Sequence, residues 1–415
     1  MKDLRWVIVI SLSFIIYHLS FSRAVAQTFY VSEGRDVRTC SSIDFTDGTL
    51  VTTAVDSITM TVPMGQRFVG GDISMLPLYE KQGAQYLDAQ GNKIPDLISF
   101  LRQQGWNTIR LRLFVDPTQD SDKAVVQDLD YVKELGKRVK QAGMLLMLDF
   151  HYSDTWADPG KQWTPAGWAT LTDAQLQTRL YEYTRDCLQQ LCAAGAAPDF
   201  IQTGNEISYG MLWGTKAAVG GNSTNRCYTN SSQANWDRFF QLLRQATRAC
   251  REVCPRAQII IHSERTPRPD VLTDYYDRLR TAKIDYDIIG LSYYPYFHGN
   301  LSVLEKALQQ LTSKGYGKPI QVVETGYPWK WAVPGTTFDY SSTYAYSSAG
   351  QQQFTAALIA LLQRFPLVNG INWWYAEANA KGCTGNLNSG WYNASLFDNE
   401  TGRALPALSE LRNFK

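Results

Sequence analysis

Ile201-Gln-Thr-Gly-Asn-Glu-Ile207 and Ile320-Gln-Val-Val-Glu-Thr-Gly-Tyr327 share one pattern, a short apolar run that ends near a glutamate. A run of this length, followed by glycine, is typical of a strand buried on both faces, as in a parallel sheet. In a (β/α)₈ barrel the carboxyl ends of all strands converge on one face. The pattern therefore predicts that Glu206 and Glu324 lie on the same face of such a barrel.

The rest of the chain agrees with this fold, because apolar strands alternate with amphipathic helical stretches eight times. The expected strands are Phe68–Met75, Thr108–Val115, Leu145–Tyr152, Phe200–Ile207, Gln258–Arg265, Asp287–Tyr294, Pro319–Tyr327 and Val368–Tyr375. The expected helices are Pro95–Gly105, Asp128–Gly143, Thr172–Ala194, Asn235–Val253, Asp270–Ile284, Leu301–Lys314, Gly350–Phe365 and Leu405–Phe414. This alternation predicts a (β/α)₈ TIM barrel over residues 66–415 rather than a doubly wound sheet.

The N-terminus has the pattern of an export signal. Lys2 and Arg5 precede an apolar run from Trp6 to Leu19, and Ala24-Val-Ala26 follows it. This order predicts a signal peptide over residues 1–26, cleaved after Ala26. An uncleaved anchor helix is the alternative, although the run is short for a membrane span. We expect an exported protein (periplasmic, on the cell surface or extracellular) without a membrane span.

Residues 27–65 differ in composition from the barrel. The stretch from Thr49 to Val62 is rich in β-branched residues and lacks a helical period. It predicts a short N-terminal β extension that is too small for a core of its own and packs on the barrel.

The overall composition narrows the class of partner. The 415 residues carry a formal net charge of +1, and 19% are charged, which indicates no basic face for nucleic acid. Aromatic residues make up 13%. Much of this fills the core, and the excess in loops suits a neutral sugar, whose C–H face stacks on flat rings. We expect a monomer whose ligand is a neutral molecule such as a sugar.

The pairing of the seven cysteines is open at this stage. Cys187/Cys192 and Cys250/Cys254 lie near the ends of two successive expected helices, which are neighbours in a barrel. A disulfide between these helices is one possibility, and buried free thiols are the other. No Cys-x-x-Cys pair or histidine cluster has zinc spacing, and we expect no metal or other cofactor.

Glu206 and Glu324 lie at the ends of the fourth and seventh expected strands, which face each other across a barrel mouth. Two carboxyl groups ~5–5.5 Å apart suit hydrolysis of a glycosidic bond by double displacement. One carboxyl must then be protonated and the other ionised, so their pKa values must differ. The pattern indicates a retaining glycosidase. The alternative is that both are surface carboxylates or members of ion pairs inside the barrel.

Neighbouring residues could cause the two glutamates to differ in pKa and could contact the sugar. Arg110 and Arg112 share one face of the second strand, and a cation near Glu324 would keep it ionised. Tyr294 could donate a hydrogen bond to the same carboxylate. Asn205 could hold a sugar 2-hydroxyl, whose hydrogen bond strengthens in the transition state.

Six phrases of the chain support a closer comparison: Phe68-Val-Gly-Gly-Asp-Ile-Ser74, Ile109-Arg-Leu-Arg-Leu-Phe-Val-Asp-Pro117, Leu148-Asp-Phe-His-Tyr-Ser-Asp-Thr-Trp-Ala-Asp-Pro-Gly-Lys-Gln162, Thr203-Gly-Asn-Glu-Ile207, Ser292-Tyr-Tyr-Pro-Tyr-Phe-His-Gly299 and Val323-Glu-Thr-Gly-Tyr327. Together they resemble the endo-β-1,4-galactanases of glycoside hydrolase family 53, over about Phe68 to Phe414. The resemblance implies a retaining enzyme that cleaves β-1,4-galactan or arabinogalactan inside the chain. It also implies that Glu206 is the acid/base and Glu324 the nucleophile.

The resemblance carries sugar-binding residues as well. Trp156, Asp158 and Lys161 fall in the loop after the third strand, which lines the sugar cleft in the family. Asp149 and His151 share a face of that strand near the mouth. His151 has two equally supported interpretations: it belongs to the residues around the catalytic pair, or it is a buried barrel histidine that does not contact the sugar.

Further binding residues follow later strands. Tyr294 and His298 belong to the matching phrase after the sixth strand. Trp374 ends the eighth strand, where its ring could stack under the sugar at the cleavage point. Trp373 is the alternative, because a shift of one residue turns the other side chain to the cleft.

The chain also departs from the family pattern. Bacterial members often follow the nucleophile with a calcium loop spaced Asp-x-Asp-x-His-x-Asn, whereas residues 326–340 offer only Asp339 as a carboxylate. The fifth and eighth strands also end differently, which leaves the number of sugar subsites open. We expect the extra carboxyls there, Glu264 and Glu377, to bind sugar or to stabilise the structure rather than to catalyse.

Two alternatives differ in function. A β-mannanase or a xylanase would use the same pair of catalytic carboxyls. Such enzymes distinguish sugars by loops that contact axial or equatorial hydroxyls, and the sequence does not define the shape of these loops. A non-catalytic glycan-binding barrel would be favoured by loss of either carboxylate, and both Glu206 and Glu324 are present.

Because the calcium loop is missing, we expect polysaccharide hydrolysis to be independent of metal ions. Treatment with EDTA should change the hydrolysis rate by less than about twofold, since no set of charged oxygen ligands was found after the nucleophile. The rate is measured before and after chelation, and again after calcium is added. A large loss that calcium restores would contradict the expectation.

Overall fold

The computed structural model describes residues 66–120, 123–215, 224–228, 233–385, 387 and 393–414, together with three strands between residues 29 and 54. The chain divides into two units, residues 1–62 and 63–415, and each is described by itself. The predicted signal peptide lies outside the described residues.

The first unit contains a three-stranded antiparallel sheet. Its strands are β1 (Phe29–Glu33), β2 (Asp36–Thr46) and β3 (Thr49–Ala54), paired in that order. The segment is therefore β-structured, as its composition suggests. Its packing on the barrel stays a prediction.

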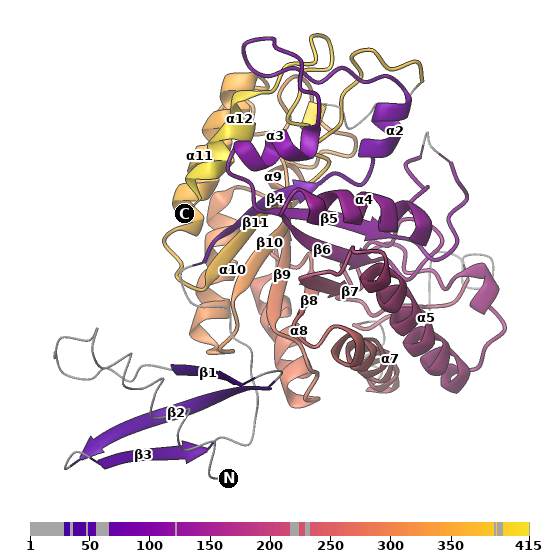
Figure 1. Ribbon diagram of the computed structural model, residues 1–415, viewed down its shortest axis with the longest axis vertical. Helices are drawn as coiled ribbons and strands as arrows, with labels where there is room; N and C mark the ends of the chain where they lie inside the picture. The colour runs from indigo at the N-terminus through magenta and orange to yellow at the C-terminus, as the bar shows by residue number, and fades with distance from the viewer. Residues whose placement is uncertain are drawn as a thin grey trace. The chain divides into compact units, whose positions relative to one another are not determined.

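The second unit is a closed barrel of eight parallel strands, which confirms the predicted fold (Figure 1). The strands are β4 (Phe68–Asp72), β5 (Thr108–Leu113), β6 (Leu145–Phe150), β7 (Phe200–Thr203), β8 (Gln258–Ser263), β9 (Ile288–Tyr293), β10 (Ile320–Thr325) and β11 (Val368–Trp373). Each strand pairs with the next along the chain, and β11 pairs with β4 to close the ring.

Helices follow the strands and surround the barrel, because parallel strands need long crossovers. They are α3 (Leu97–Gln103), α4 (Leu129–Gln141), α5 (Asp173–Ala193), α7 (Gln233–Val253), α8 (Pro269–Thr281), α10 (Leu301–Ser313), α11 (Ser348–Leu362) and α12 (Pro406–Glu410). The last one is shorter than predicted and continues as a 3₁₀ turn, Leu411–Asn413. Short helices α2 (Leu76–Lys81) and α9 (Pro295–His298) and a 3₁₀ turn (Ala166–Trp168) lie in the loops.

The inside of the barrel changes character along its axis. At the amino ends of the strands, the rings of Phe68 and Phe200 meet edge to face with centroids 4.9 Å apart. At the carboxyl ends, buried charged side chains such as Asp72, Arg110 and Asp149 take their place. The apolar layer closes the barrel, and the polar layer forms the floor of the site described below.

Strand β7 ends earlier than the sequence indicates. The predicted strand runs to Ile207, but extended structure stops at Thr203 because Gly204 and Glu206 have positive φ angles of 107° and 49°. Left-handed backbone cannot continue a strand. Glu206 therefore stands on a turn just beyond the strand. Within the described residues, no helix is long and apolar enough to cross a membrane.

Candidate active site

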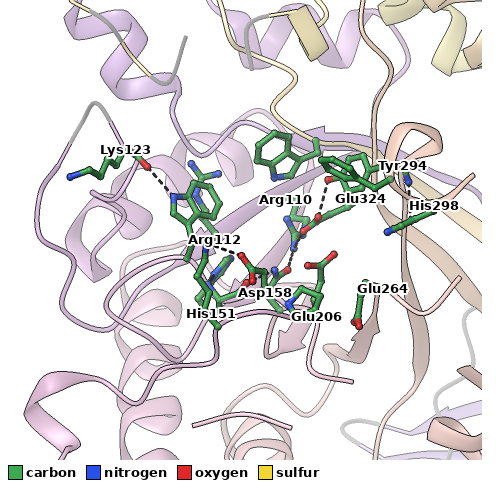
Figure 2. A pocket seen from close by; sticks show the side chains of 17 residues that line it. Arg110, Arg112, Lys123, His151, Asp158, Glu206, Glu264, Tyr294, His298 and Glu324 are labelled. Carbon is green, nitrogen blue, oxygen red and sulfur yellow. Dashed lines mark hydrogen bonds and ion pairs between the residues drawn. The ribbon is translucent and has the colours of Figure 1, made fainter. Parts of the chain in front are cut away.

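A cavity of about 670 Å³ lies at the carboxyl ends of the barrel strands (Figure 2). It is lined by Arg110, Arg112, Lys123, His151, Trp156, Ala157, Asp158, Pro159, Lys161, Asn205, Glu206, Glu264, Tyr294, Phe297, His298, Glu324 and Trp374. Every predicted site residue is in this set except Asp149. That carboxylate is fully buried in β6, below the cavity.

Glu324 is held by one cation and one hydroxyl. It lies in β10, and its Oε1 atom is 2.8 Å from Nη2 of Arg110. The Tyr294 hydroxyl donates a hydrogen bond of 2.8 Å to its Oε2 atom. Both contacts favour the ionised form. Burial raises the pKa of Glu324, and the Arg110 guanidinium and the Tyr294 hydroxyl oppose that rise.

Glu206 is in a different environment, with hydroxyl and imidazole neighbours instead of a cation. Ser292 donates a hydrogen bond of 2.6 Å to its Oε1 atom. Burial, followed by the negative charges of Glu324 and Glu264, raises the pKa of Glu206 well above its ordinary value. The contacts around the two carboxyls therefore favour the protonated form of Glu206 and the ionised form of Glu324.

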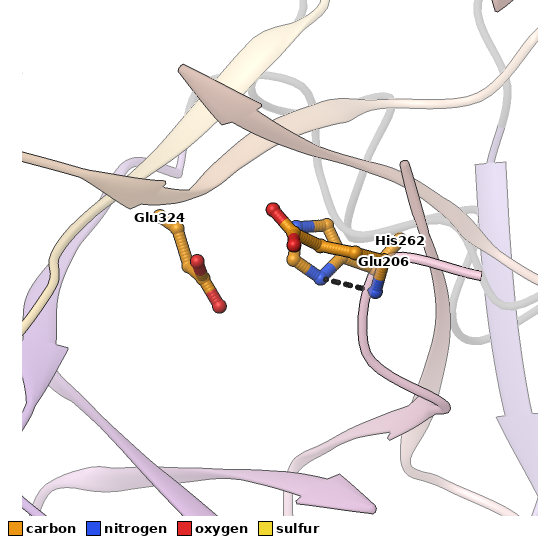
Figure 3. A group of neighbouring side chains, drawn as sticks. All are labelled: Glu206, His262 and Glu324. Atoms are coloured by element: carbon orange, nitrogen blue, oxygen red, sulfur yellow. Dashed lines mark hydrogen bonds between the residues drawn. The ribbon is translucent and has the colours of Figure 1, made fainter. Parts of the chain in front are cut away.

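The two carboxyl groups face each other across a short gap (Figure 3). One oxygen of each carboxyl and one ring nitrogen of His262 all lie within 4.8 Å of one another. This separation is closer to the ~5–5.5 Å of retaining glycosidases than to the ~6.5–9.5 Å of inverting ones, in which a water fits between the base and the sugar. The arrangement suits a nucleophile and a proton donor that act on one glycosidic bond.

Arg110 connects the pair to the barrel interior. Its guanidinium also contacts Asp72 of β4 at 3.2 Å and Asp149 of β6 at 2.8 Å. Asp72 in turn binds Arg112 at 3.0 Å. Arg112 instead packs over the ring of Trp156, 4.5 Å from its centroid. Of the two predicted supporting cations, Arg110 is the one that holds Glu324.

His262 is a part of the site that sequence reasoning missed. Its Nδ1 atom accepts a hydrogen bond from the Glu206 backbone N–H (3.3 Å), and its Nε2 atom lies 2.8 Å from Oγ of Ser292. Burial holds the pKa of His262 well below its ordinary value, so the ring is neutral. Because Ser292 donates to Glu206, it accepts from Nε2–H. The only signal was a histidine in the otherwise apolar run of β8.

The comparisons with known proteins agree with this geometry. The model of the family "Glycosyl hydrolase family 53" matches residues 68–411. The chain belongs to glycosyl hydrolase family 53. It is a glycoside hydrolase, and glycoside hydrolases of this family degrade galactan and arabinogalactan.

Relatives span nearly the whole family 53 domain. An arabinogalactan endo-beta-1,4-galactanase of Cellvibrio japonicus is 34% identical over 82% of this chain and 89% of its own length. A probable arabinogalactan endo-beta-1,4-galactanase A of Neosartorya fischeri is 33% identical over 78% and 88%. The structure of the Ignisphaera aggregans GH53 catalytic domain is similar with a TM-score of 0.73, at 32% identity over 85% of this chain and 97% of that domain.

One wall of the cavity of this family 53 enzyme comes from the loop after β6. His151 is fixed there by Asp149 (3.0 Å to Nε2) and by the Ala157 N–H, which donates to Nδ1. Asp158 pairs with Lys161 at 2.9 Å. These contacts shape the loop, and Trp156, Asp158 and Lys161 present side chains to the cavity.

A second wall comes from the ends of β9 and β11. Trp374 lines the cavity, with its ring centroid 6.3 Å from that of Trp156. Trp373 instead points into the core and donates its indole N–H to the carbonyl of Ala394. Of the two tryptophans, Trp374 is therefore the one whose ring faces the cavity. Burial lowers the pKa of His298, on the same side, to about 4, so this ring is neutral too.

Asn205 lines the cavity but is already engaged on both sides of its amide. Oδ1 accepts from Arg110 (2.9 Å), and Nδ2 donates to the carbonyl of Ala157 (2.8 Å). This fixes its orientation next to Glu206. A role in holding the sugar 2-hydroxyl stays a prediction.

The two extra carboxyls occupy different places. Glu264 lines the cavity and accepts a hydrogen bond from Ser208 while pairing with Arg265. Glu377 is buried away from the cavity and accepts from the backbone N–H of Met75. Burial raises the pKa of Glu377 to about 8. Only Glu264 is placed to affect the chemistry.

A metal could be held, within the described residues, by one group of three side chains: Glu206, His262 and Glu324. Both ring nitrogens of His262 already lie within hydrogen-bond distance of Glu206 and Ser292. The same oxygens are needed for the carboxyl pair. A metal ion bound here would therefore compete with these hydrogen bonds and with the contacts of the two carboxyls.

Glu264→Gln should move the alkaline limb of the pH profile to lower pH. The Glu264 carboxylate is one of the charges that raise the pKa of Glu206, and a proton donor loses activity as the pH rises through its pKa. The pH dependence of kcat/KM measures this limb. Glu377→Gln is the matched control, since that carboxyl lies outside the cavity. A limb that stays in place or moves upward in Glu264→Gln would contradict the assignment.

Proposed function

We propose that this family 53 enzyme is an exported, retaining endo-β-1,4-galactanase that cleaves internal bonds of galactan and arabinogalactan. The carboxyl pair carries the proposal: two oxygens within 4.8 Å, one carboxyl beside a guanidinium and one without a cation. The substrate follows from the relatives that bear this name. Export follows from the N-terminal pattern of the sequence.

In the first step Glu324 attacks the anomeric carbon while Glu206 protonates the leaving oxygen. Arg110 and Tyr294 hold both oxygens of the nucleophile, which fixes the direction of attack. On Glu206, Oε1 accepts from Ser292, so the proton is carried on Oε2. The result is a glycosyl ester on Glu324.

The second step reverses the role of Glu206. Forming the ester removes the negative charge of Glu324, which is one of the causes that raise the pKa of Glu206. The pKa of Glu206 therefore falls once the ester has formed. Its carboxylate, which has already given up its proton, stays ionised and can act as the base that takes a proton from water. Attack by that water releases the sugar with its original configuration.

The aromatic walls suit a neutral polymer. Trp156 and Trp374 present rings to the cavity above the nucleophile, and no charge on the sugar is needed for stacking on them. A β-mannanase or xylanase would share the catalytic pair, and the names of the family relatives favour galactan over those substrates.

A polysaccharide panel tests the substrate. Purified protein should shorten galactan early in the reaction and release short β-1,4-galacto-oligosaccharides, because internal bonds are cut. Product sizes are measured on galactan, arabinan, mannan and xylan. Release of galactose alone from chain ends would refute internal cleavage, and activity confined to mannan or xylan would favour the alternative substrates.

Substitution of each glutamate tests the mechanism. Glu324→Gln should lower kcat on every substrate by about 10⁴-fold or more, because no ester can form. Glu206→Ala should be much less impaired in the first step on an aryl galactobioside, whose leaving group departs with little protonation. It should then stall before hydrolysis, which appears as a burst of released phenol.

Azide provides the control for Glu206→Ala. Azide attacks without losing a proton, so it should restore turnover of that variant and yield a β-configured glycosyl azide. Product configuration is read by NMR. An α-configured azide would exclude double displacement.

A further inference from the structure

The C-terminal ends of helices α5 and α7 each carry a cysteine, and the two thiols touch. Cys192 lies in the last turn of α5, and Cys254 is the first residue after α7. Their Sγ atoms are 3.6 Å apart, although the residues are 62 positions apart in the chain. We infer that Cys192 and Cys254 form a disulfide bond when a disulfide oxidant is available.

The geometry needs little adjustment. A disulfide brings the sulfurs to ~2.05 Å, so each sulfur must move by less than about 1 Å from its present position. Helices α5 and α7 pack against each other along their length, which keeps the two ends together. Cys187 and Cys250, about one turn earlier, are buried in the core, and the Cys383 thiol donates to the carbonyl of Asn379. The structure thus selects one pair among those that the sequence left open.

The two thiols have complementary reactivity. Cys192 is half-buried and can be reached from solvent, whereas Cys254 is buried. The hydrogen bond from Cys254 lowers the pKa of Cys192 to about 7, so much of it is thiolate at neutral pH. The same hydrogen bond, and then burial, raise the pKa of Cys254. Cys192 is the attacking thiol and Cys254 the resolving one.

The reaction balances as two successive exchanges. The Cys192 thiolate attacks one sulfur of oxidised glutathione, breaks its S–S bond and expels one glutathione thiolate. The Cys254 sulfur, whose proton passes to that thiolate, then attacks the Cys192 sulfur and expels the second glutathione. Two protein thiols are oxidised, and one small disulfide is reduced to two thiols.

The position of the bond predicts what it does. Arg251, near the end of α7, pairs at 2.8 Å with Asp287, which directly precedes β9. The helix ends therefore lie at the amino ends of the strands, opposite the cavity, where a barrel contributes stability rather than chemistry. The bond would close a segment that contains β7 and Glu206. It should raise stability by restricting the unfolded chain and leave catalysis unchanged.

Peptide mapping tests the bond directly. Full-length mature protein is incubated with oxidised glutathione, its free thiols are alkylated, and it is cut with trypsin without reduction. We expect the peptide 252–256, which holds Cys254, to be linked to 186–216, which holds Cys192 and Cys187. Repeating the mapping in Cys187→Ser assigns the link to Cys192. Recovery of Cys192 and Cys254 alkylated, or Cys254 linked to another cysteine, would overturn the inference.

Thermal unfolding provides the second measurement. Dithiothreitol should lower the unfolding midpoint of the oxidised protein by roughly 5 °C, since a long loop is released. Cys192→Ser should abolish this shift, and its half-buried site keeps the variant foldable even where Cys254→Ser fails. Cys383→Ser, which removes a thiol elsewhere, should keep the shift. An equal shift in Cys192→Ser would refute the bond, whatever substrate the enzyme cleaves.

Discussion

The site depends on one buried cation. The Arg110 guanidinium is 1% exposed and contacts carboxylates from three other strands, Asp72, Asp149 and Glu324. Charges in a barrel interior are tolerated only when they are paired, and removing one partner leaves the others uncompensated. The strands that carry these groups must therefore keep their places around the ring. Glu324 is positioned by the same contacts that hold the polar layer of the barrel together.

The difference between the two glutamates follows from this layer. Glu324 receives a cation and a phenolic hydroxyl, while Glu206 receives a serine hydroxyl and a backbone contact to a neutral histidine. His262 closes a ring of hydrogen bonds that starts at the Glu206 N–H and returns through Ser292 to the Glu206 carboxyl. The left-handed backbone at Glu206 is strained, and strain of this kind is kept where it orients a functional group.

Much of the architecture was readable from local patterns. Apolar runs and helical periods predicted the eight strands, and the glutamates at the ends of the fourth and seventh predicted strands line one cavity as expected. The contacts that hold the site residues in place were harder to predict from the sequence. Asp149 was expected to bind the sugar but is fully buried and does not line the cavity, because Arg110, Gln202 and His151 all bind its oxygens. His262 gave little signal, since a histidine in an apolar strand is compatible with many roles.

The sequence by itself determined the order of strands and helices, the two carboxyls and the family to which they belong, because these depend on the period of side chains and on short contiguous motifs. The tertiary structure decided which cation holds the nucleophile, which of Trp373 and Trp374 faces the cavity and which cysteines touch. It also decided the different neighbours of the two carboxyls, a guanidinium beside Glu324 and a serine hydroxyl beside Glu206. These properties arise from groups that meet across the barrel from distant parts of the chain. Their burial and distances are set by the packing of the whole ring, and no local stretch of sequence encodes them.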